Sequence, residues 1–156
     1  GGTGMEHYQG FLTGNLMLDL AITAWFAAQM IKVLTDLAIR RKSSLSALIS
    51  SGGMPSSHSA FVCALAVSMG IAYGWHSPLF ALAAGLAAVV MYDAFNVRWS
   101  TGEQAKALNQ LLGSLEDLPP DLKGRRLKEA LGHTPFQVLM GALLGISVGL
   151  LTLLWK

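Results

Sequence analysis

Charged residues are scarce in this chain of 156 residues: Asp, Glu, Lys and Arg make up 13% of it, whereas hydrophobic residues make up 53%. With a mean hydropathy of +0.49, this composition excludes an ordinary soluble domain of this size. The basic residues lie beside apolar runs and do not form a soluble basic domain, so we also exclude nucleic-acid binding. We expect a single domain over residues 5–156, because Gly1 to Gly4 before Met5 are typical of a cloning remnant.

Cysteine is nearly absent as well. Cys63 is the sole cysteine, which excludes a disulfide within the chain. The pattern of a cleavable signal peptide is also lacking, because the first apolar run is long and no small-residue cleavage site follows it. Two of the histidines, His58 and His133, together with one carboxylate do not have a recognised zinc-ligand spacing. We therefore expect no metal and no other cofactor.

Four long apolar runs dominate what is present. Each is close to the length of about 20 residues that an α helix needs to cross a bilayer. The runs are Asn15–Leu34, Ser59–Trp75, Leu79–Phe95 and Thr134–Trp155. They predict an all-α fold, a polytopic membrane helical bundle of about four transmembrane helices. We expect residues 104–109 to continue the third helix as a cytoplasmic extension, and residues 43–54 to form a surface helix or a re-entrant loop.

Lysine and arginine are distributed unequally over the two sides of this bundle. With four spans, all of them except Lys156 fall on one side. The positive-inside rule makes that side cytoplasmic, so both termini face outward. We expect an integral protein of an inner, plasma or thylakoid-type membrane. The candidate catalytic groups described below all lie on the same cytoplasmic side, which supports a single active site there.

The stretch Gly52–Ala60, GGMPSSHSA, is the most informative in the chain. Such a cluster of Gly, Pro and Ser between apolar runs predicts a tight loop that ends in the start of a helix. Pro55 suits the first helical turn. Ser56 and Ser57 can cap the helix, and the free N–H groups there form an anion site. His58 lies among these donors and can exchange a proton near neutral pH.

A second histidine, His133, also lies at the mouth of a predicted helix, and two cations, Lys32 and Arg98, end the neighbouring spans. Phosphoryl transfer needs positive groups around the phosphoryl oxygens, a nucleophile and an acid for the leaving group. One histidine can attack phosphorus and form a phosphohistidine. The other, of the pair His58 and His133, can protonate the departing alkoxide. This scheme requires no metal.

The attacking histidine needs an acceptor that holds its other ring nitrogen. Gln137 lies four residues after His133 and therefore on the same helix face, where it can accept that hydrogen bond. Asp93 is the alternative orienting residue. Both Gln137 and Asp93 are therefore candidate catalytic residues.

Three glycines recur every four residues in the last span, at Gly141, Gly145 and Gly149. Such a stripe of small residues lets helices approach closely. The partner is either another span of the chain or a second subunit, so the stripe leaves a homo-oligomer open.

Three motifs resemble a known family. The sequence PSSH at Pro55–His58 is similar to the PSGH motif of the type 2 phosphatidic acid phosphatase and vanadium haloperoxidase superfamily. The sequences YDAFNVR at Tyr92–Arg98 and GHTPFQV at Gly132–Val138 resemble the divergent small membrane branch of that superfamily. The resemblance covers most of the chain from Asn15 onward. It implies a helical membrane phosphatase.

The resemblance also implies roles for individual residues. His133 is the expected nucleophile and His58 the expected general acid. Four other residues are expected to hold the phosphate, and these are Lys32, Ser56, Ser57 and Arg98. The expected activity is hydrolysis of a phosphomonoester lipid, such as phosphatidylglycerophosphate or phosphatidic acid, at the cytoplasmic leaflet.

The chain departs from the superfamily pattern at several positions. Gln137 stands where an aspartate is expected, and Ser57 replaces the glycine of PSGH. Leu127 stands where the third motif has arginine, with Arg126 one step away. These departures favour an alternative function, a non-catalytic membrane protein that binds anionic lipid headgroups.

Overall fold

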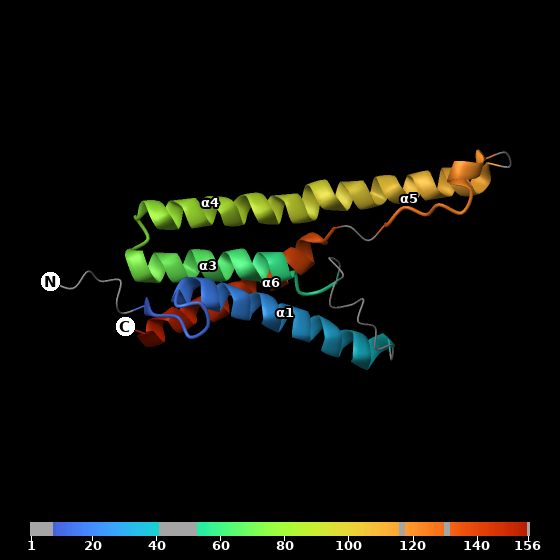
Figure 1. Cartoon of the computed structure of the whole chain (residues 1–156). Helices are drawn as coiled ribbons and strands as arrows, with labels where there is room; N and C mark the ends of the chain where they lie inside the picture. Colours follow the sequence, from blue (N-terminus) through green and yellow to red (C-terminus); the bar gives the residue numbers. More distant parts are fainter. Residues whose placement is uncertain (1–7, 41–52, 116–117, 130–131, 156) are drawn as a thin grey trace.

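The computed structural model describes residues 8–40, 53–115, 118–129 and 132–155. These residues form helices joined by loops (Figure 1). The α helices are α1 (Leu16–Arg40), α3 (Ser57–Tyr73), α4 (Pro78–Tyr92), α5 (Arg98–Ser114) and α6 (Pro135–Gly149). A π-helical turn, η2 (Asp93–Val97), joins α4 to α5, and two 3₁₀ segments are η3 (Pro120–Leu122) and η4 (Leu150–Trp155). The predicted all-α class is confirmed.

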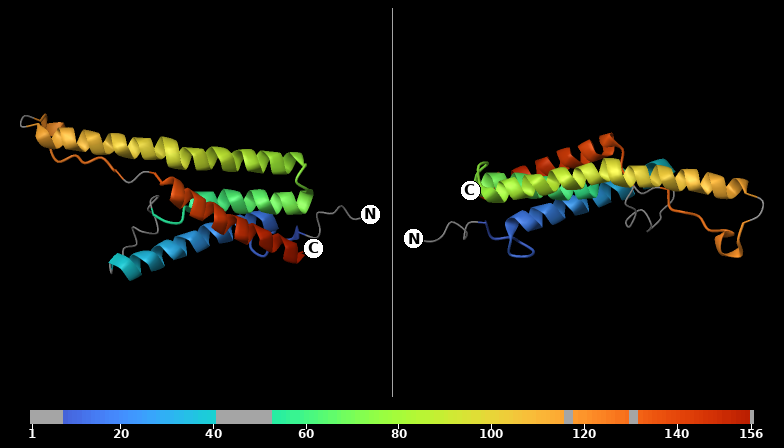
Figure 2. Two further views of the ribbon diagram at one scale, coloured as in Figure 1. Left: turned by 180° about the vertical axis from the view of Figure 1, so that it is seen from behind. Right: turned by 90° about the horizontal axis from the view of Figure 1, so that it is seen from above.

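Helix α3 is the centre of the bundle. It packs against α1, α4 and α6, and Figure 1 shows it between α4 and α1. Seen from behind in Figure 2, α6 crosses the same helix. Small buried side chains allow this close approach, namely Ala24 and Ala28 of α1 and Ala60 and Ala64 of α3, with Leu144 and Val148 of α6 packed against them. Such small-residue contacts are the usual way in which helices associate in lipid.

The glycine stripe of α6 faces α3. A Cβ atom added at Gly141 would collide with the Ser56 carbonyl, and one at Gly145 would collide with the Ala60 carbonyl. At Gly149 it would lie 2.8 Å from Cβ of Val67. The stripe thus has its partner within the chain. Of the two partners left open by the sequence, the structure supplies another span, and no second subunit is needed to cover these glycines.

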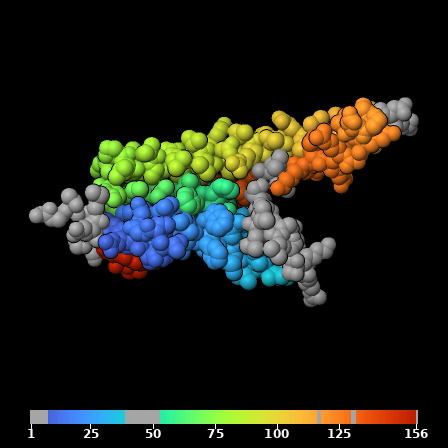
Figure 3. Space-filling model, viewed as in Figure 1, coloured from blue at the N-terminus to red at the C-terminus, as the bar shows by residue number. Residues whose placement is uncertain are grey.

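Helices α4 and α5 continue into each other through the π turn. The combined helix, Pro78–Ser114, has 37 residues, which corresponds to about 55 Å at 1.5 Å per residue. That is nearly twice the roughly 30 Å of a bilayer's hydrocarbon core. Figure 3 shows α5 and the segment that follows it projecting beyond the packed body as an arm. This arm is the predicted helical extension.

Asn109 holds the returning segment of the arm against α5. Its side-chain nitrogen donates to the Leu127 carbonyl at 2.9 Å, and its side-chain oxygen accepts from the Leu127 amide at 2.9 Å. The same nitrogen donates to Glu129 at 2.7 Å. These bonds direct the chain back toward the start of α6.

Three helical stretches of the described residues are long and apolar enough to cross a membrane, namely Leu16–Ala38, Pro78–Ser114 and Pro135–Trp155. Helix α3 is apolar but shorter, with 17 residues, at the lower end of the range for a spanning helix. The starts of α3 and α6 lie at one end of the bundle, which we call the site end. Residues 43–52 of the predicted surface helix or re-entrant loop lie outside the described residues.

At the opposite end, Asp19 of α1 is fully buried. Its carboxylate accepts hydrogen bonds from the Leu12 amide at 2.7 Å and from the Thr13 amide at 2.9 Å. The charge that would be costly in lipid is therefore satisfied by the loop before α1. Asp19 therefore has a structural role, since it fixes the loop before α1, and it lies away from the site end.

Candidate active site

The loop before α3 places Ser56 at the helix N-cap. Its hydroxyl accepts from the Ser59 amide at 3.3 Å and from the Ser59 hydroxyl at 3.0 Å. Its own amide donates to the Gln137 carbonyl at 3.1 Å. Ser56 is fully buried and ties the start of α3 to the start of α6. Both polar groups of this expected phosphate ligand are therefore engaged within the protein.

Lys32 of α1 reaches the first turn of α3. Its ammonium nitrogen lies 3.5 Å from the Ser57 hydroxyl, and the residue is only 4% exposed. The aliphatic part of the same side chain passes beneath Gly53 in the preceding loop. The first turn of an α helix presents amides that lack partners inside the helix, and these attract anions. Lys32 adds a buried positive charge beside them.

The start of α6 forms a capping box around Gln137. The Thr134 hydroxyl accepts from the Gln137 amide at 3.3 Å, and the Gln137 side-chain oxygen accepts from the Thr134 amide at 3.1 Å. The same oxygen lies 3.3 Å from Nδ1 of His133. Gln137 therefore fixes the helix start and the imidazole together.

These contacts decide the tautomer of His133. The Gln137 atom that faces the Thr134 amide must be the oxygen, because a backbone N–H needs an acceptor. The same oxygen faces Nδ1 of His133. An amide oxygen can only accept a hydrogen bond, so Nδ1 must carry the proton. In the neutral ring, Nε2 then carries the free electron pair. In this neutral tautomer the atom that can attack is Nε2, whereas in the charged ring both nitrogens carry protons and the Gly53 carbonyl accepts a hydrogen bond as well.

The π turn supplies a further anchor for His133. In this turn the Arg98 amide donates to the Asp93 carbonyl, five residues back, in place of the usual four. The Ala94 carbonyl accepts a hydrogen bond from the His133 amide at 3.0 Å. π turns are often found at functional sites because they release such groups from the helical ladder. Here the turn joins α4–α5 to the entry of α6.

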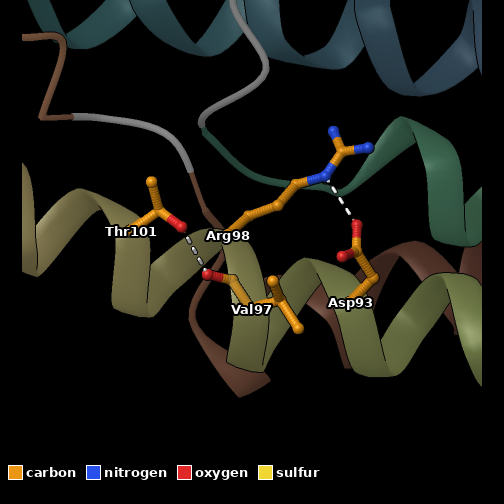
Figure 4. A network of polar contacts seen from close by, with 4 residues as sticks. All are labelled: Asp93, Val97, Arg98 and Thr101. Atoms are coloured by element: carbon orange, nitrogen blue, oxygen red, sulfur yellow. Dashed lines mark hydrogen bonds and ion pairs between the residues drawn. The ribbon is translucent and has the colours of Figure 1, made fainter.

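Asp93 and Arg98 form an ion pair at the edge of the site. The Asp93 carboxylate accepts from Nε of Arg98 at 2.7 Å, and both side chains are partly exposed. Figure 4 shows this pair, with the two terminal nitrogens of Arg98 directed away from the carboxylate. It also shows Thr101, whose hydroxyl donates to the Val97 carbonyl at 2.9 Å. Asp93 thus orients Arg98, whereas Gln137 makes the contact with His133.

A cavity of about 230 Å³ lies between the two histidines and the ion pair. Its lining residues come from α3, from the α4–α5 helix and from the entry of α6, and they are His58, Val89, Val90, Asp93, Ala94, Arg98 and His133. Both histidines therefore border one space, together with Arg98. A cavity in which four titratable side chains converge among apolar ones is typical of a ligand site.

The electrostatic surroundings favour a neutral His133. Burial lowers the pKa of its imidazole, which is 3% exposed. Hydrogen bonds to Gln137 and to the Gly53 backbone oppose this effect, while the nearby charges of Lys32 and His58 lower the pKa further. A neutral imidazole is the nucleophilic form. The proximity of Lys32 and His58 also shows that residues from three distant parts of the chain meet here.

The residues singled out from the sequence all lie at the site end. Those that line the cavity are His58, Asp93, Arg98 and His133. Lys32 and Ser57 contact each other beside it, and Gln137 contacts His133. Sequence reasoning missed the π turn and the anchor at Ala94, since YDAFNVR reads as uninterrupted helix.

Comparisons with known proteins identify relatives of the chain. A family model described as the Divergent PAP2 family matches residues 13–148. A relative from Bacillus subtilis (strain 168), the "Uncharacterized membrane protein YuiD", is 40% identical over 149 residues, which cover 89% of this chain and 94% of that protein. No solved structure matches the chain.

Proposed function

The chain belongs to the Divergent PAP2 family, and from this premise we propose that it is a membrane phosphatase that hydrolyses a lipid phosphomonoester. The observation that carries the proposal is the shared cavity, in which His58, His133 and Arg98 face one space of about 230 Å³. Phosphatidic acid and phosphatidylglycerophosphate are the substrates we propose, bound at the cytoplasmic leaflet in the orientation given by the basic residues.

In the first step, Nε2 of His133 attacks phosphorus and the bond to the alkoxide oxygen breaks. His58 donates its proton to that oxygen, so that a neutral alcohol leaves. Nδ1–H of His133 stays hydrogen-bonded to Gln137, which keeps Nε2 aimed at the phosphoryl group. Lys32 and Arg98 balance the charge on the phosphoryl oxygens.

In the second step, water hydrolyses the phosphohistidine. His58, now neutral, removes a proton from the water as it attacks phosphorus, and the bond to Nε2 breaks. Inorganic phosphate is released, and both histidines return to their initial protonation states. Because the same residue acts as acid and then as base, each step leaves His58 ready for the next.

The test uses the purified full chain in mixed micelles with ³²P-labelled phosphatidic acid or phosphatidylglycerophosphate. We expect release of inorganic phosphate, and a quench in alkaline SDS is expected to trap label on His133 in a form that is stable to base and lost in acid. His76→Ala serves as the control, since His76 lies in the exposed turn at the opposite end. Release that is unchanged in His133→Ala would refute the assignment of the nucleophile.

A second candidate is a non-catalytic protein that binds anionic lipid headgroups. The neutral amide of Gln137 favours it, because an amide stabilises an imidazolium less than a carboxylate does. Vanadate separates the two candidates. A phosphatase is inhibited by vanadate bound next to His133, whereas a headgroup-binding protein shows lipid binding without release of phosphate.

A further inference from the structure

A second cavity of about 320 Å³ adjoins the first. Its walls come from three helices, with Ile22 and Trp25 from α1, His58, Phe61 and Val62 from α3, and Val90 from α4. His58 and Val90 line both cavities. Apart from His58, every residue of the second cavity is apolar or aromatic. We call it the apolar cavity, and the first one the polar cavity.

The two cavities are arranged in the same order on every helix that builds them. On α1, Ile22 and Trp25 precede Gln29 and Lys32 on one helix face, since these positions are separated by three or four residues. Lys32 lies about 15 Å further along the helix than Ile22 at 1.5 Å per residue. The apolar positions therefore lie deep in the bundle, and the charged position lies at the site end.

The other two helices repeat this order. On α3, His58 is in the first turn, and Phe61 follows one turn deeper. On the α4–α5 helix, Val90 lies one turn deeper than Asp93 and two turns deeper than Arg98. The combined space therefore has a charged mouth and an apolar interior, which matches an amphiphile.

The apolar cavity also has a side on which a chain can enter. Helices α1 and α4 both pack on α3, yet they make at most marginal contact with each other. Ile22 and Trp25 lie within a stretch that can span a membrane, and so does Val90. The gap between α1 and α4 is thus at the depth of lipid tails. Surrounding lipid is equally apolar, so only the shape of the cavity and its position next to His58 would distinguish a chain bound there from the lipid around it.

We propose that the apolar cavity binds one acyl chain of the lipid whose phosphate occupies the polar cavity, with the chain entering between α1 and α4. This inference rests on the proposed function for the nature of the headgroup. It adds that the protein selects a phosphate ester with a long chain over a soluble one. Ile22, Trp25 and Phe61 are then residues that determine specificity.

The test is photo-cross-linking, which does not depend on turnover. The full chain in mixed micelles is incubated with a phosphatidic acid that carries a diazirine in the middle of one acyl chain. After illumination, labelled peptides are mapped. We expect label at Ile22, Trp25 and Phe61, and competition by unlabelled phosphatidic acid. Glycerol 3-phosphate, which lacks a chain, is expected to compete poorly.

Two variants and one control sharpen the result. Ile22→Trp fills the cavity and is expected to remove most of this label, and Ile22→Phe does so to a smaller extent with less risk to folding. Leu82→Trp makes a matched change on α4 at a position that is 73% exposed, outside the cavity. It is expected to leave the label in place. Equal thermal unfolding of the variants shows that they are folded.

The outcomes separate this inference from the proposed function. Label spread over outward-facing leucines, and unchanged by Ile22→Trp, would overturn the acyl-chain site even if phosphate is released. Label confined to the cavity without release of phosphate from any ester would support the acyl-chain site and contradict the phosphatase. An increase in KM for phosphatidic acid in Ile22→Trp, with KM for glycerol 3-phosphate unchanged, would support both.

Discussion

The two helix entries that carry the histidines are built alike and hold their imidazoles differently. Each begins with a hydroxyl cap that accepts from the third residue of its helix at 3.3 Å, Ser56 from Ser59 and Thr134 from Gln137. His58 lies inside the first turn of α3 and is exposed, whereas His133 precedes the α6 cap and is buried.

The difference follows from the third residue of each helix. The short Ser59 side chain reaches only the cap hydroxyl. The longer Gln137 side chain reaches back to the cap amide and to Nδ1 of His133. A fixed imidazole suits attack on phosphorus, since a nucleophile must be aligned. A more accessible imidazole such as His58 suits proton exchange with a leaving group and with water. The same helical motif thus holds one imidazole fixed and leaves the other accessible.

The largest expected effect is that of His133→Ala. Removal of the nucleophile is expected to lower kcat by about 10³-fold or more, because loss of a nucleophile abolishes the covalent route. The loss should be the same for alkyl and aryl phosphates. Phosphate release from both substrate types measures it, with His76→Ala as the matched histidine control. A loss that differs strongly between the two substrate types would contradict the assignment of His133 as the nucleophile.

His58→Ala is expected to have the next largest effect. A general acid contributes about 10²–10⁴-fold, so hydrolysis of an alkyl phosphate should fall by that factor. An aryl phosphate has a leaving group that needs no proton, so its first step, measured as release of the phenol in a single turnover, should fall much less, although the second step loses its base with either substrate. The ratio of the two rates is the measurement. Equal losses for both substrates would contradict the assignment of His58 as the acid.

Gln137→Glu tests how the orienting side chain sets the pKa of His133. Burial lowers the pKa of His133 in the parent protein, so its activity should persist below about pH 6.5, the pKa of a free imidazole. A carboxylate beside Nδ1 favours the imidazolium and raises this pKa. The acid limb of the pH–rate profile should then move up by about one pH unit. Gln104→Glu in the arm adds the same charge elsewhere and should leave the profile unchanged.

The smallest expected effects come from the caps. Ser56→Ala and Thr134→Ala should each lower the free energy of unfolding by about 1 kcal/mol, measured by thermal unfolding in detergent. Ser56→Ala should leave KM unchanged, because the hydroxyl is buried and bonded to Ser59. Thr134→Ala should also disturb the pH profile, since it loosens Gln137. An increase in KM in Ser56→Ala would mean that this hydroxyl binds phosphate after all.

Much of this arrangement could be predicted from the sequence. Apolar runs give the helices because their lengths match the bilayer, and the basic residues place Lys32, His58 and His133 on one side. The contact of Gln137 with His133 follows from helical spacing. The pairing of Asp93 with Arg98 was not predicted, because a choice between two orienting residues depends on directions in space.

Other features leave no signal in a single sequence. The bond between the Ser56 amide and the Gln137 carbonyl joins main-chain groups, and any residue pair could make it. The apolar cavity lies beside α3, where α1 and α4 each pack on α3 but hardly contact each other. Valine and phenylalanine at its walls look the same in the sequence as residues in contact with lipid.

The π turn at Asp93–Val97 makes the length of this segment a constraint on the site. It accommodates one more residue than an α-helical turn would. Insertion of one more residue there would exceed what a single π turn absorbs, and it would rotate everything downstream by about 100°, the angle of one helical residue. Arg98 would then turn away from the polar cavity, although every residue would still favour a helix. A shift in helical phase at this turn would therefore abolish the function of the site without unfolding the protein.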